Sequence, residues 1–258
     1  QMSVRKTRKR ILLVLMVAAV VVTSVIFTAP AQAAQTTNPA IFLNGKRMTG
    51  VDAVLTEGVT WVKLRSFSET MGNCTIAWDN GTRTATVKAS GLEITAKDGS
   101  GYIVANGRYL YTGEAVKIFS NSSMYIPVRL LAKAYGLDVV WNPSDCSVML
   151  TSASGPIMSG DSYYDYGSLY WLSHIIHAES GTESLLGKIA VGNVVLNRVA
   201  KDEYPNTIYE VIFDNRYAVQ FSPTASGTIY NTPSQESVIA AKICLEGYSL
   251  SSDIVYFF

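Results

Sequence analysis

Cysteine and histidine are scarce in this chain of 258 residues, which contains three cysteines and two histidines. Cys74, Cys146 and Cys244 are an odd number, at spacings that match neither a metal site nor a disulfide framework. A bond between Cys74 and Cys146 stays open, because the sequence does not give the distance between two residues. We interpret all three cysteines as structural, and we expect no metal and no other cofactor.

Charged residues are also few, at 16% of the chain, and the formal net charge is only +1. The sequence contains no strongly basic patch, whereas phosphate backbones are bound through clustered Lys and Arg. Nucleic acid is therefore not expected as a partner. The hydrophobic fraction of 48% is sufficient for packed cores, and the length allows two domains.

Residues 1–33 are predicted to be an export signal. A basic start from Arg5 to Arg10 is followed by an apolar stretch from Ile11 to Phe27 and by Ala31-Gln32-Ala33. This order is typical of a cleaved secretory signal peptide. The alternative is an uncleaved membrane anchor, because the apolar stretch has nearly the length that spans a bilayer. Both interpretations predict an exported protein, which contacts the membrane only if the segment is retained.

An internal repeat defines the first domain. Arg65 and Gly72 recur 64 residues later as Arg129 and Gly136, and a tryptophan follows each pair. Such constant spacing indicates a duplicated unit. Each unit is predicted to contain a hairpin with a type I′ Asn-Gly turn, a strand, a short helix from the Arg to a capping Gly, and two further strands.

The duplicated stretch resembles the copper amine oxidase N-terminal-like domain over residues 40–151, through the paired Arg, Gly and Trp positions and the Asn44-Gly45 and Asn106-Gly107 turns. The resemblance implies a β-rich, non-catalytic module of exported Gram-positive proteins, associated with the wall or acting as a spacer. Copper is not implied, because the stretch contains no histidine. Residues 152–163, rich in Ser and Gly, are predicted to be a linker.

Residues 164–258 are predicted to be a mainly helical domain. Leu169, Leu172 and Ile176 are spaced as one apolar face of a helix, and Glu179 falls on the same face. Burial raises the pKa of a carboxyl group, and a glutamate that stays protonated can act as a general acid. Periodicity alone leaves two alternatives open: an exposed Glu at a frayed helix end, or a Glu paired with Arg198.

A second helix, over residues 187–200, is apolar around most of its circumference and is therefore predicted to be buried. Its Asn193 and Asn197 share one face, where they either satisfy polar groups of the core or line a cleft. Capping boxes at 207–210 and 232–235 predict two further helices. The loop between these helices contains side chains suited to sugar binding, namely Gln220, Phe221, Tyr230 and Asn231.

The run from Ile175 to Val199, IIHAESGTESLLGKIAVGNVVLNRV, resembles the signature of the SleB-type cell wall hydrolases, the spore cortex-lytic family. Blocks at 204–208, 219–221 and 255–257 also fit, so that the resemblance covers about residues 168–258. Glu179 falls on the family's catalytic glutamate. Thr182 departs from the family, since it replaces the second-last residue, a glycine, of the Glu-Ala-x-Gly-Glu pattern.

The resemblance implies an α+β protein of two domains, in which the β-rich repeat precedes a mainly α domain of the lysozyme or lytic transglycosylase type. It implies cleavage of the β-1,4 bond between N-acetylmuramic acid and N-acetylglucosamine in peptidoglycan, in cell wall or spore cortex turnover, with Glu179 as acid and base. The predicted substrate-binding residues are Glu183, Asn197, Gln220, Phe221, Tyr230 and Tyr256. Because the family continues beyond the Tyr-Phe strand, the domain is expected to be truncated at its C-terminus.

Three alternatives remain open. A hydrolase needs a second carboxylate, for which Glu183 is the candidate if residues 179–183 are helical, although Gly181 argues against that helix. A metal-dependent hydrolase would use His174 and His177, but the His-Glu-x-x-His motif is absent. The third alternative is an inactive or truncated protein that only binds the cell wall. The sequence does not indicate an oligomeric state.

Overall fold

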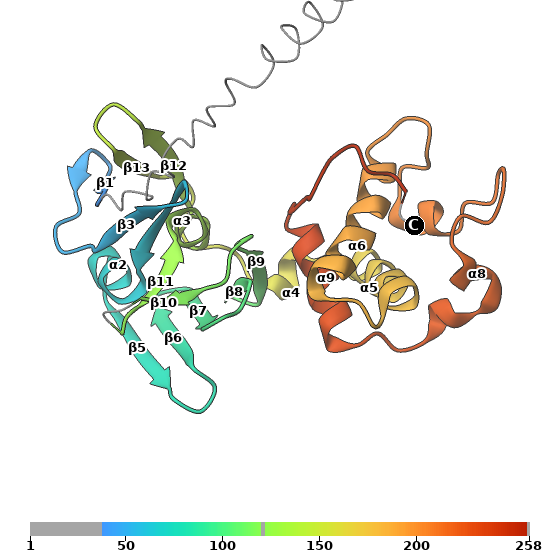
Figure 1. Ribbon diagram of the computed structural model, residues 1–258, viewed down its shortest axis with the longest axis horizontal. Helices are drawn as coiled ribbons and strands as arrows, with labels where there is room; N and C mark the ends of the chain where they lie inside the picture. Colours follow the sequence, from blue (N-terminus) through green and yellow to red (C-terminus); the bar gives the residue numbers. More distant parts are fainter. Residues whose placement is uncertain (1–37, 120–121, 257–258) are drawn as a thin grey trace, which may run out of the picture. The chain divides into compact units, whose positions relative to one another are not determined.

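The computed structural model describes residues 38–119 and 122–256 of the chain (Figure 1). The predicted signal peptide, residues 1–33, lies outside these ranges. No helix in the two described ranges is long and apolar enough to span a bilayer. A β-rich module ends at Ser152, and a helical domain begins at Gly160 (Figure 1), which confirms the predicted α+β architecture.

The β-rich module contains three sheets and two short helices among its described residues. The elements of its first half are β1 (Ala40–Leu43), β2 (Lys46–Arg47), β3 (Ala53–Thr56), β4 (Val59–Lys63), α2 (Leu64–Met71), β5 (Cys74–Asp79), β6 (Thr84–Ala89) and β7 (Leu92–Lys97). The second half contains β8 (Tyr102–Ala105), β9 (Arg108–Tyr111), β10 (Lys117–Ile118), β11 (Met124–Pro127), α3 (Val128–Tyr135), β12 (Leu137–Asn142) and β13 (Ser147–Ser152). The sheet orders are β12-β13-β1-β2, β10-β11-β4-β3 and β5-β6-β7-β8-β9.

The strand pairing confirms the duplication. The equivalent strands β4 and β11 are antiparallel neighbours at the centre of one sheet, with Val62 opposite Ile126. Strand β1 of the first unit runs parallel to β13 of the second unit, and β8 of the second unit pairs with β7 of the first. The helices α2 and α3 bury equivalent side chains, Phe67 and Leu131, completely. Each unit therefore contributes its hairpin to a sheet of the other.

Both Asn-Gly hairpins adopt the predicted type I′ turn. The φ angles are 50° and 79° at Asn44 and Gly45, and 49° and 79° at Asn106 and Gly107. Positive φ at both central residues is what this turn requires. Gly72 lies at the C-cap of α2, where the sequence predicts that the helix ends, but its φ of 148° and ψ of −170° are not left-handed helical angles. Helix α2 therefore ends without a left-handed cap.

The segment predicted as a linker, residues 152–163, is packed on the β-rich module over part of its length. The Ile157 side chain is buried in the core of the module, and its backbone N–H donates to the Ala134 carbonyl at 3.0 Å. Gly136, the left-handed cap of α3, allows a close approach, since a Cβ there would lie 1.7 Å from the carbonyl oxygen of Gly155. The segment is thus anchored to the module by backbone hydrogen bonds and one apolar side chain.

The helical domain contains α4 (Gly160–Tyr163), α5 (Tyr166–Ser180), α6 (Leu185–Val199), α7 (Ile208–Ile212), α8 (Ser222–Ser226), the 3₁₀ helix η1 (Thr228–Tyr230) and α9 (Gln235–Leu245). Helices α5, α6 and α9 pack against one another around an apolar core. Gly192 of α6 permits this packing. A Cβ at that position would lie 2.7 Å from Sγ of Cys244 and 2.9 Å from Cδ1 of Ile176.

Side-chain caps mark the starts of α7 and α9. Thr207 accepts a hydrogen bond from the Glu210 N–H at 3.2 Å, which confirms the capping box of α7. The predicted start of α9 at Thr232 is wrong, because Ser234 is the cap and accepts from the Ser237 N–H at 3.2 Å. The Ser234 N–H in turn donates to Nδ1 of His177 on α5 at 3.5 Å, a tertiary contact that helps to fix this later start.

The bond between Cys74 and Cys146 that the sequence left open is not formed. Cys74 has a free thiol. Cys244 is buried in the helical core, where its Sγ donates to the Ile189 carbonyl at 3.5 Å. Burial raises the pKa of the Cys244 thiol to about 12, so the group stays neutral at physiological pH, as a structural role requires.

Candidate active site

Helix α5 places Glu179 one residue before its end. Leu172 and Ile176, on the same face, are completely buried, and the Ser180 hydroxyl donates to the Ile176 carbonyl at 2.7 Å. Glu179 itself is half-buried. Helix α5 ends at Ser180, and a turn follows. The carboxyl group thus lies at the junction between a rigid apolar helix and a turn, as the periodicity predicts.

Burial raises the pKa of Glu179 above its ordinary value. Loss of hydration favours the neutral form of a carboxyl group, and a nearby cation would oppose that effect. No ion pair joins Glu179 to Arg198 or to any other cation among the described residues. The pairing with Arg198 that the sequence left open is therefore not formed, and the carboxyl group is suited to carry a proton.

Polar side chains of α6 hold the C-terminal segment of the chain against the domain. The Asn193 amide donates to the Tyr248 carbonyl and accepts from the Leu250 N–H, both at 2.8 Å. Asn197 donates to the carbonyl groups of Ser251 and Ile254, at 2.7 and 2.8 Å. These bonds fix the path of the segment that ends in Tyr256.

This arrangement creates a hollow of about 350 Å³ beside Glu179. The residues that line it are Glu179, Arg198, Val219, Gln220, Phe221, Ser222 and Tyr256. The structure therefore brings together four of the residues predicted from the sequence, and they come from α5, from the loop before α8 and from the C-terminal segment. Glu179 is the one carboxylate among these lining residues.

Arg198 also lines the hollow, although it is not among the predicted substrate-binding residues. It is 4% exposed, and its Nε donates to the Val255 carbonyl at 2.9 Å. The guanidinium carbon lies 5.1 to 5.4 Å from the ring centres of Tyr204, Phe221 and Tyr256. Its Nη1 is buried without a hydrogen-bond partner in the described part of the chain. The signal in the sequence was a charged residue on a helix that is apolar around most of its circumference, a signal that Arg198 shares with Lys188.

The other predicted substrate residues lie elsewhere. Glu183 is exposed in the turn after α5, which is not helical, so Glu179 and Glu183 do not share a helix face. Both amide hydrogens of Asn197 are bound by the backbone of the C-terminal segment. Tyr230 is 61% exposed, with its ring 6.3 Å from that of Trp171. A contact of these three residues with substrate stays a prediction.

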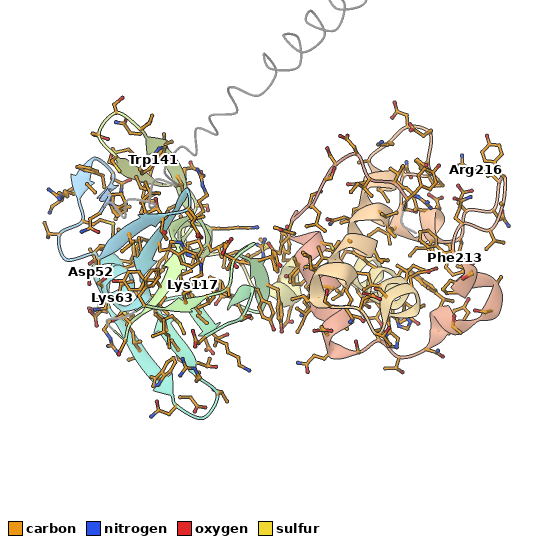
Figure 2. The ribbon with its side chains drawn as sticks, viewed as in Figure 1. Asp52, Lys63, Lys117, Trp141, Phe213 and Arg216 are labelled. Atoms are coloured by element: carbon orange, nitrogen blue, oxygen red, sulfur yellow. The ribbon has the colours of Figure 1, made fainter. Side chains whose placement is uncertain are left out.

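A larger hollow of about 720 Å³ lies along α7 and the loop after it, where Figure 2 labels Phe213 and Arg216. Its carboxylates include Glu210, which accepts from the Thr207 hydroxyl at 2.9 Å, and Asp214. Hydrogen bonds from Arg216 hold the pKa of Asp214 below its usual value. Since a general acid must carry a proton, we place the candidate active site at Glu179 rather than in this larger hollow.

The two histidines are engaged by the protein backbone. Nδ1 of His174 lies 2.8 Å from the Ile229 carbonyl oxygen, and Nδ1 of His177 accepts from the Ser234 N–H. In the described part of the chain, no three His, Cys, Asp or Glu side chains are grouped as metal ligands. The geometry thus offers Glu179, amide groups and aromatic rings for chemistry at the smaller hollow.

Each of the two regions of the chain matches a known protein family. Residues 182–258 match the Cell Wall Hydrolase family, beginning just after Glu179, and residues 42–150 match the copper amine oxidase N-terminal domain. The spore cortex-lytic enzyme of Bacillus cereus is 33% identical over 95 residues, which are 37% of this chain and 36% of that protein. The spore cortex-lytic enzyme of Bacillus subtilis is 29% identical over 87 residues, which are 34% and 28% of the two chains.

Among solved structures, the catalytic domain of the germination-specific lytic transglycosylase SleB from Bacillus anthracis is 33% identical. That comparison covers 37% of this chain and 75% of the other, with a TM-score of 0.34. The chain spans about a third of the length of the curated relatives it matches. The two resemblances predicted from sequence motifs are confirmed. The C-terminal domain of the chain thus matches the Cell Wall Hydrolase family and is homologous to the spore cortex-lytic enzymes, and it follows a copper amine oxidase N-terminal domain.

Proposed function

We propose that this protein cleaves the β-1,4 bond between N-acetylmuramic acid and N-acetylglucosamine in peptidoglycan, as a lytic transglycosylase with Glu179 as acid and base. The observation that carries the proposal is the position of Glu179. It is the one carboxylate among the residues lining its hollow, and burial raises its pKa. Gln220, Phe221 and Tyr256 beside it offer the amide group and aromatic faces that suit a sugar ring.

The mechanism uses one carboxyl group twice. Protonated Glu179 donates its proton to the glycosidic oxygen, the bond from C1 to that oxygen breaks, and positive charge develops on the muramic acid ring. The Glu179 carboxylate then accepts the proton of the C6 hydroxyl, whose oxygen bonds to C1. The products are a 1,6-anhydromuramic end and a free hydroxyl on N-acetylglucosamine. The mechanism requires no second carboxylate, and it consumes no water.

The lining of the hollow supports this route over hydrolysis. Hydrolases with two carboxylates hold them about 5 to 9.5 Å apart across the scissile bond. Glu183 is exposed in a turn and does not line the hollow of Glu179. With a single carboxylate at the bond, one group serves first as acid and then as base, and the C6 hydroxyl of the muramic acid ring is the nucleophile whose attack yields the anhydro product.

The setting that we propose is outside the cell, in the wall of a Gram-positive bacterium or in its spore cortex. The predicted signal segment supports export. The relatives from Bacillus cereus and Bacillus subtilis are named spore cortex-lytic enzymes, which favours a role in spore germination or wall turnover. The substrate partner is the peptidoglycan glycan strand.

The first test is mass spectrometry of the soluble fragments that the full chain releases from purified peptidoglycan. We expect anhydromuramic ends from the unaltered protein and none from Glu179→Gln, which keeps the size of the side chain but has no proton of comparable acidity to donate. Reducing muramic ends would instead indicate hydrolysis by a second carboxylate. Absence of any fragment would contradict the activity and favour a protein that only binds the wall.

Glu183→Gln is the matched control. It makes the same chemical change four residues away, in the exposed turn. The single-glutamate mechanism predicts that this variant still forms anhydro ends, with at most an altered KM. Loss of product comparable to that in Glu179→Gln would assign Glu183 to the chemistry. Addition of a chelator is expected to leave the rate unchanged, and a loss of rate would favour the metal-dependent alternative.

A further inference from the structure

The β-rich module contains two hollows that are lined by equivalent residues of its two repeated units. The first hollow, of about 190 Å³, is lined in part by Arg65, Ile76, Trp78 and Ala85. The second, of about 490 Å³, is lined in part by Arg129, Val139, Trp141 and Val148. Each of these residues of the second hollow follows its counterpart by 63 or 64 positions in the sequence. The duplication has therefore produced two related concave surfaces.

The backbone holds the two hollows in the same way. Trp78 of β5 pairs with Ala85 of β6, and Trp141 of β12 pairs with Val148 of β13. In both units the Arg is the second residue of the short helix that follows the central strand. The shared register puts an indole ring and a guanidinium group on the rim of each hollow. Trp141 is labelled on the β12–β13 hairpin in Figure 2.

These two tryptophans differ from the tryptophan of the module core. Trp61 is 1% exposed, whereas Trp78 is 41% exposed and Trp141 is half-buried. Nε1 of Trp78 donates to the Asn80 side chain at 2.6 Å, which satisfies the polar edge of the ring and fixes its orientation. Trp141 packs in part against the module core, but both rings remain partly exposed beside a hollow, and exposed aromatic rings at a concave surface are typical of binding sites.

The charge beside the second hollow is positive. Arg65, at the first hollow, forms an exposed ion pair with Glu69 at 3.4 Å. The residue equivalent to Glu69 in the second unit is Lys133, so Arg129 has no acidic neighbour one helix turn away. Among the described residues, Arg129 forms no ion pair. The second hollow thus offers a flat apolar ring and an unpaired guanidinium group, which together suit a sugar that carries a carboxylate.

We propose that the β-rich module binds peptidoglycan glycan strands through these two hollows, with sugar rings against Trp78 and Trp141 and a muramic or stem-peptide carboxylate on Arg129. A polymer with a repeating unit suits a surface with repeated sites, because two weak contacts on one chain add to its avidity. Tyr111, which also lines the second hollow, packs on Tyr248 of the helical domain with ring centres 4.4 Å apart. The proposal rests on the proposed function, since it takes the same polymer as its ligand.

The test is co-sedimentation of the full chain with purified, protein-free peptidoglycan, in the Glu179→Gln background so that cleavage does not consume the ligand. We expect Trp141→Ala to weaken binding about tenfold, and Trp78→Ala with Trp141→Ala to weaken it further. Trp141→Phe is expected to retain most of the affinity, because it keeps an aromatic face. Tyr166→Ala, which removes an exposed ring of α5, is the control and is expected to bind normally.

Arg129→Gln tests the chemistry of the ligand. It is expected to weaken binding to peptidoglycan and to leave binding to chitin unchanged, because chitin has N-acetylated sugars but no carboxylate. Equal binding of the double Trp variant and the parent would overturn the proposal, provided that circular dichroism shows both to be folded. A Trp141-dependent dimer in sedimentation equilibrium would also overturn it, because the second hollow would then hold another copy of the chain.

Binding by the two hollows and cleavage at Glu179 are measured separately. Release of anhydro fragments together with unaltered binding of the tryptophan variants would refute the two hollows alone. Tryptophan-dependent binding without any released fragment would refute the activity alone and would support the hollows.

Discussion

Arg108 of β9 and Glu246, 138 residues later at the end of α9, form a two-pronged ion pair. Nε and Nη2 of Arg108 each lie 2.7 Å from a carboxylate oxygen, and the two side chains are 8% and 3% exposed. Lys133 of α3 and the Tyr164 hydroxyl also donate to Glu246, both at 2.9 Å. The carboxylate of the helical domain is therefore surrounded by donors, two of which belong to the β-rich module.

The first prediction concerns the stability that this pair provides. Arg108→Met removes the guanidinium group and its two hydrogen bonds, so that the buried Glu246 carboxylate keeps only the bonds from Lys133 and Tyr164. Breaking one side of a buried ion pair costs about 3 kcal/mol, so we expect the free energy of unfolding to fall by about that amount. Urea denaturation of the full chain, followed by circular dichroism, measures the loss.

Lys88→Met is the matched control for that experiment. Lys88 forms an ion pair with Glu93 at 3.2 Å, but their side chains are 63% and 52% exposed. Exposed pairs contribute about 0.5 kcal/mol or less, so this variant is expected to unfold almost like the parent. If Arg108→Met were no less stable than Lys88→Met, the buried pair would not hold the two regions together.

The second prediction is the pH dependence of the same contact. Burial alone would raise the pKa of Glu246, but hydrogen bonds from Arg108 and Lys133 outweigh it and hold the pKa below its usual value. The stabilisation is then fully present above the unfolded-state pKa of about 4.3 and is lost as pH falls through the lower folded-state pKa. We expect the melting temperature of the parent to fall over this acidic range. In Glu246→Gln it should be lower at neutral pH and depend less on acid, and equal pH profiles would contradict the prediction.

Much of the fold could be predicted because its signals are local. A constant spacing of Arg, Gly and Trp revealed the duplication, and Asn-Gly pairs with positive φ formed the expected turns. The position of Glu179 followed from the period of α5. The turns and the helix period depend on residues that are close together in the sequence, and the duplication is visible because the same local pattern occurs twice, 64 residues apart.

The rest depends on contacts between distant residues. Asn197 and Arg198 use their hydrogen bonds to hold a backbone segment that lies 54 to 57 residues further on. The sequence of their helix shows only that polar side chains interrupt an apolar surface. It does not show which groups those side chains bind. Likewise, the Ser-rich and Gly-rich composition of 152–163 indicates a loop but not the burial of Ile157. Such partners are set by the tertiary fold.

The third prediction separates two candidate caps of α9. Ser234 is the cap in the structure, whereas Thr232 heads the capping box in the sequence. Replacing an N-cap Ser by Ala costs about 1 kcal/mol, so Ser234→Ala is expected to lower the free energy of unfolding by that amount. Thr232→Ala, the control two residues earlier, is expected to change it by less than about 0.5 kcal/mol. The reverse order of the two variants would return the helix start to Thr232.

The fourth prediction is the pH profile of cleavage. Glu179 has to be protonated to donate to the glycosidic oxygen, so the rate falls as pH rises through its pKa. Burial raises that pKa, and the alkaline limb should therefore lie at higher pH than an ordinary glutamate would give. Initial rates of fragment release from purified peptidoglycan, measured from acidic to alkaline pH, locate the limb.

Charges placed at Val219 test whether Glu179 is the group that titrates. Val219 lines the same hollow and is 53% exposed, so its replacement leaves the apolar core in place. A cation favours the ionised carboxyl group and an anion disfavours it. We expect Val219→Lys to move the alkaline limb to lower pH, Val219→Glu to move it to higher pH, and the neutral Val219→Gln to leave it in place. If the two charged variants moved the limb in the same direction, or not at all, a group remote from this hollow would control the rate.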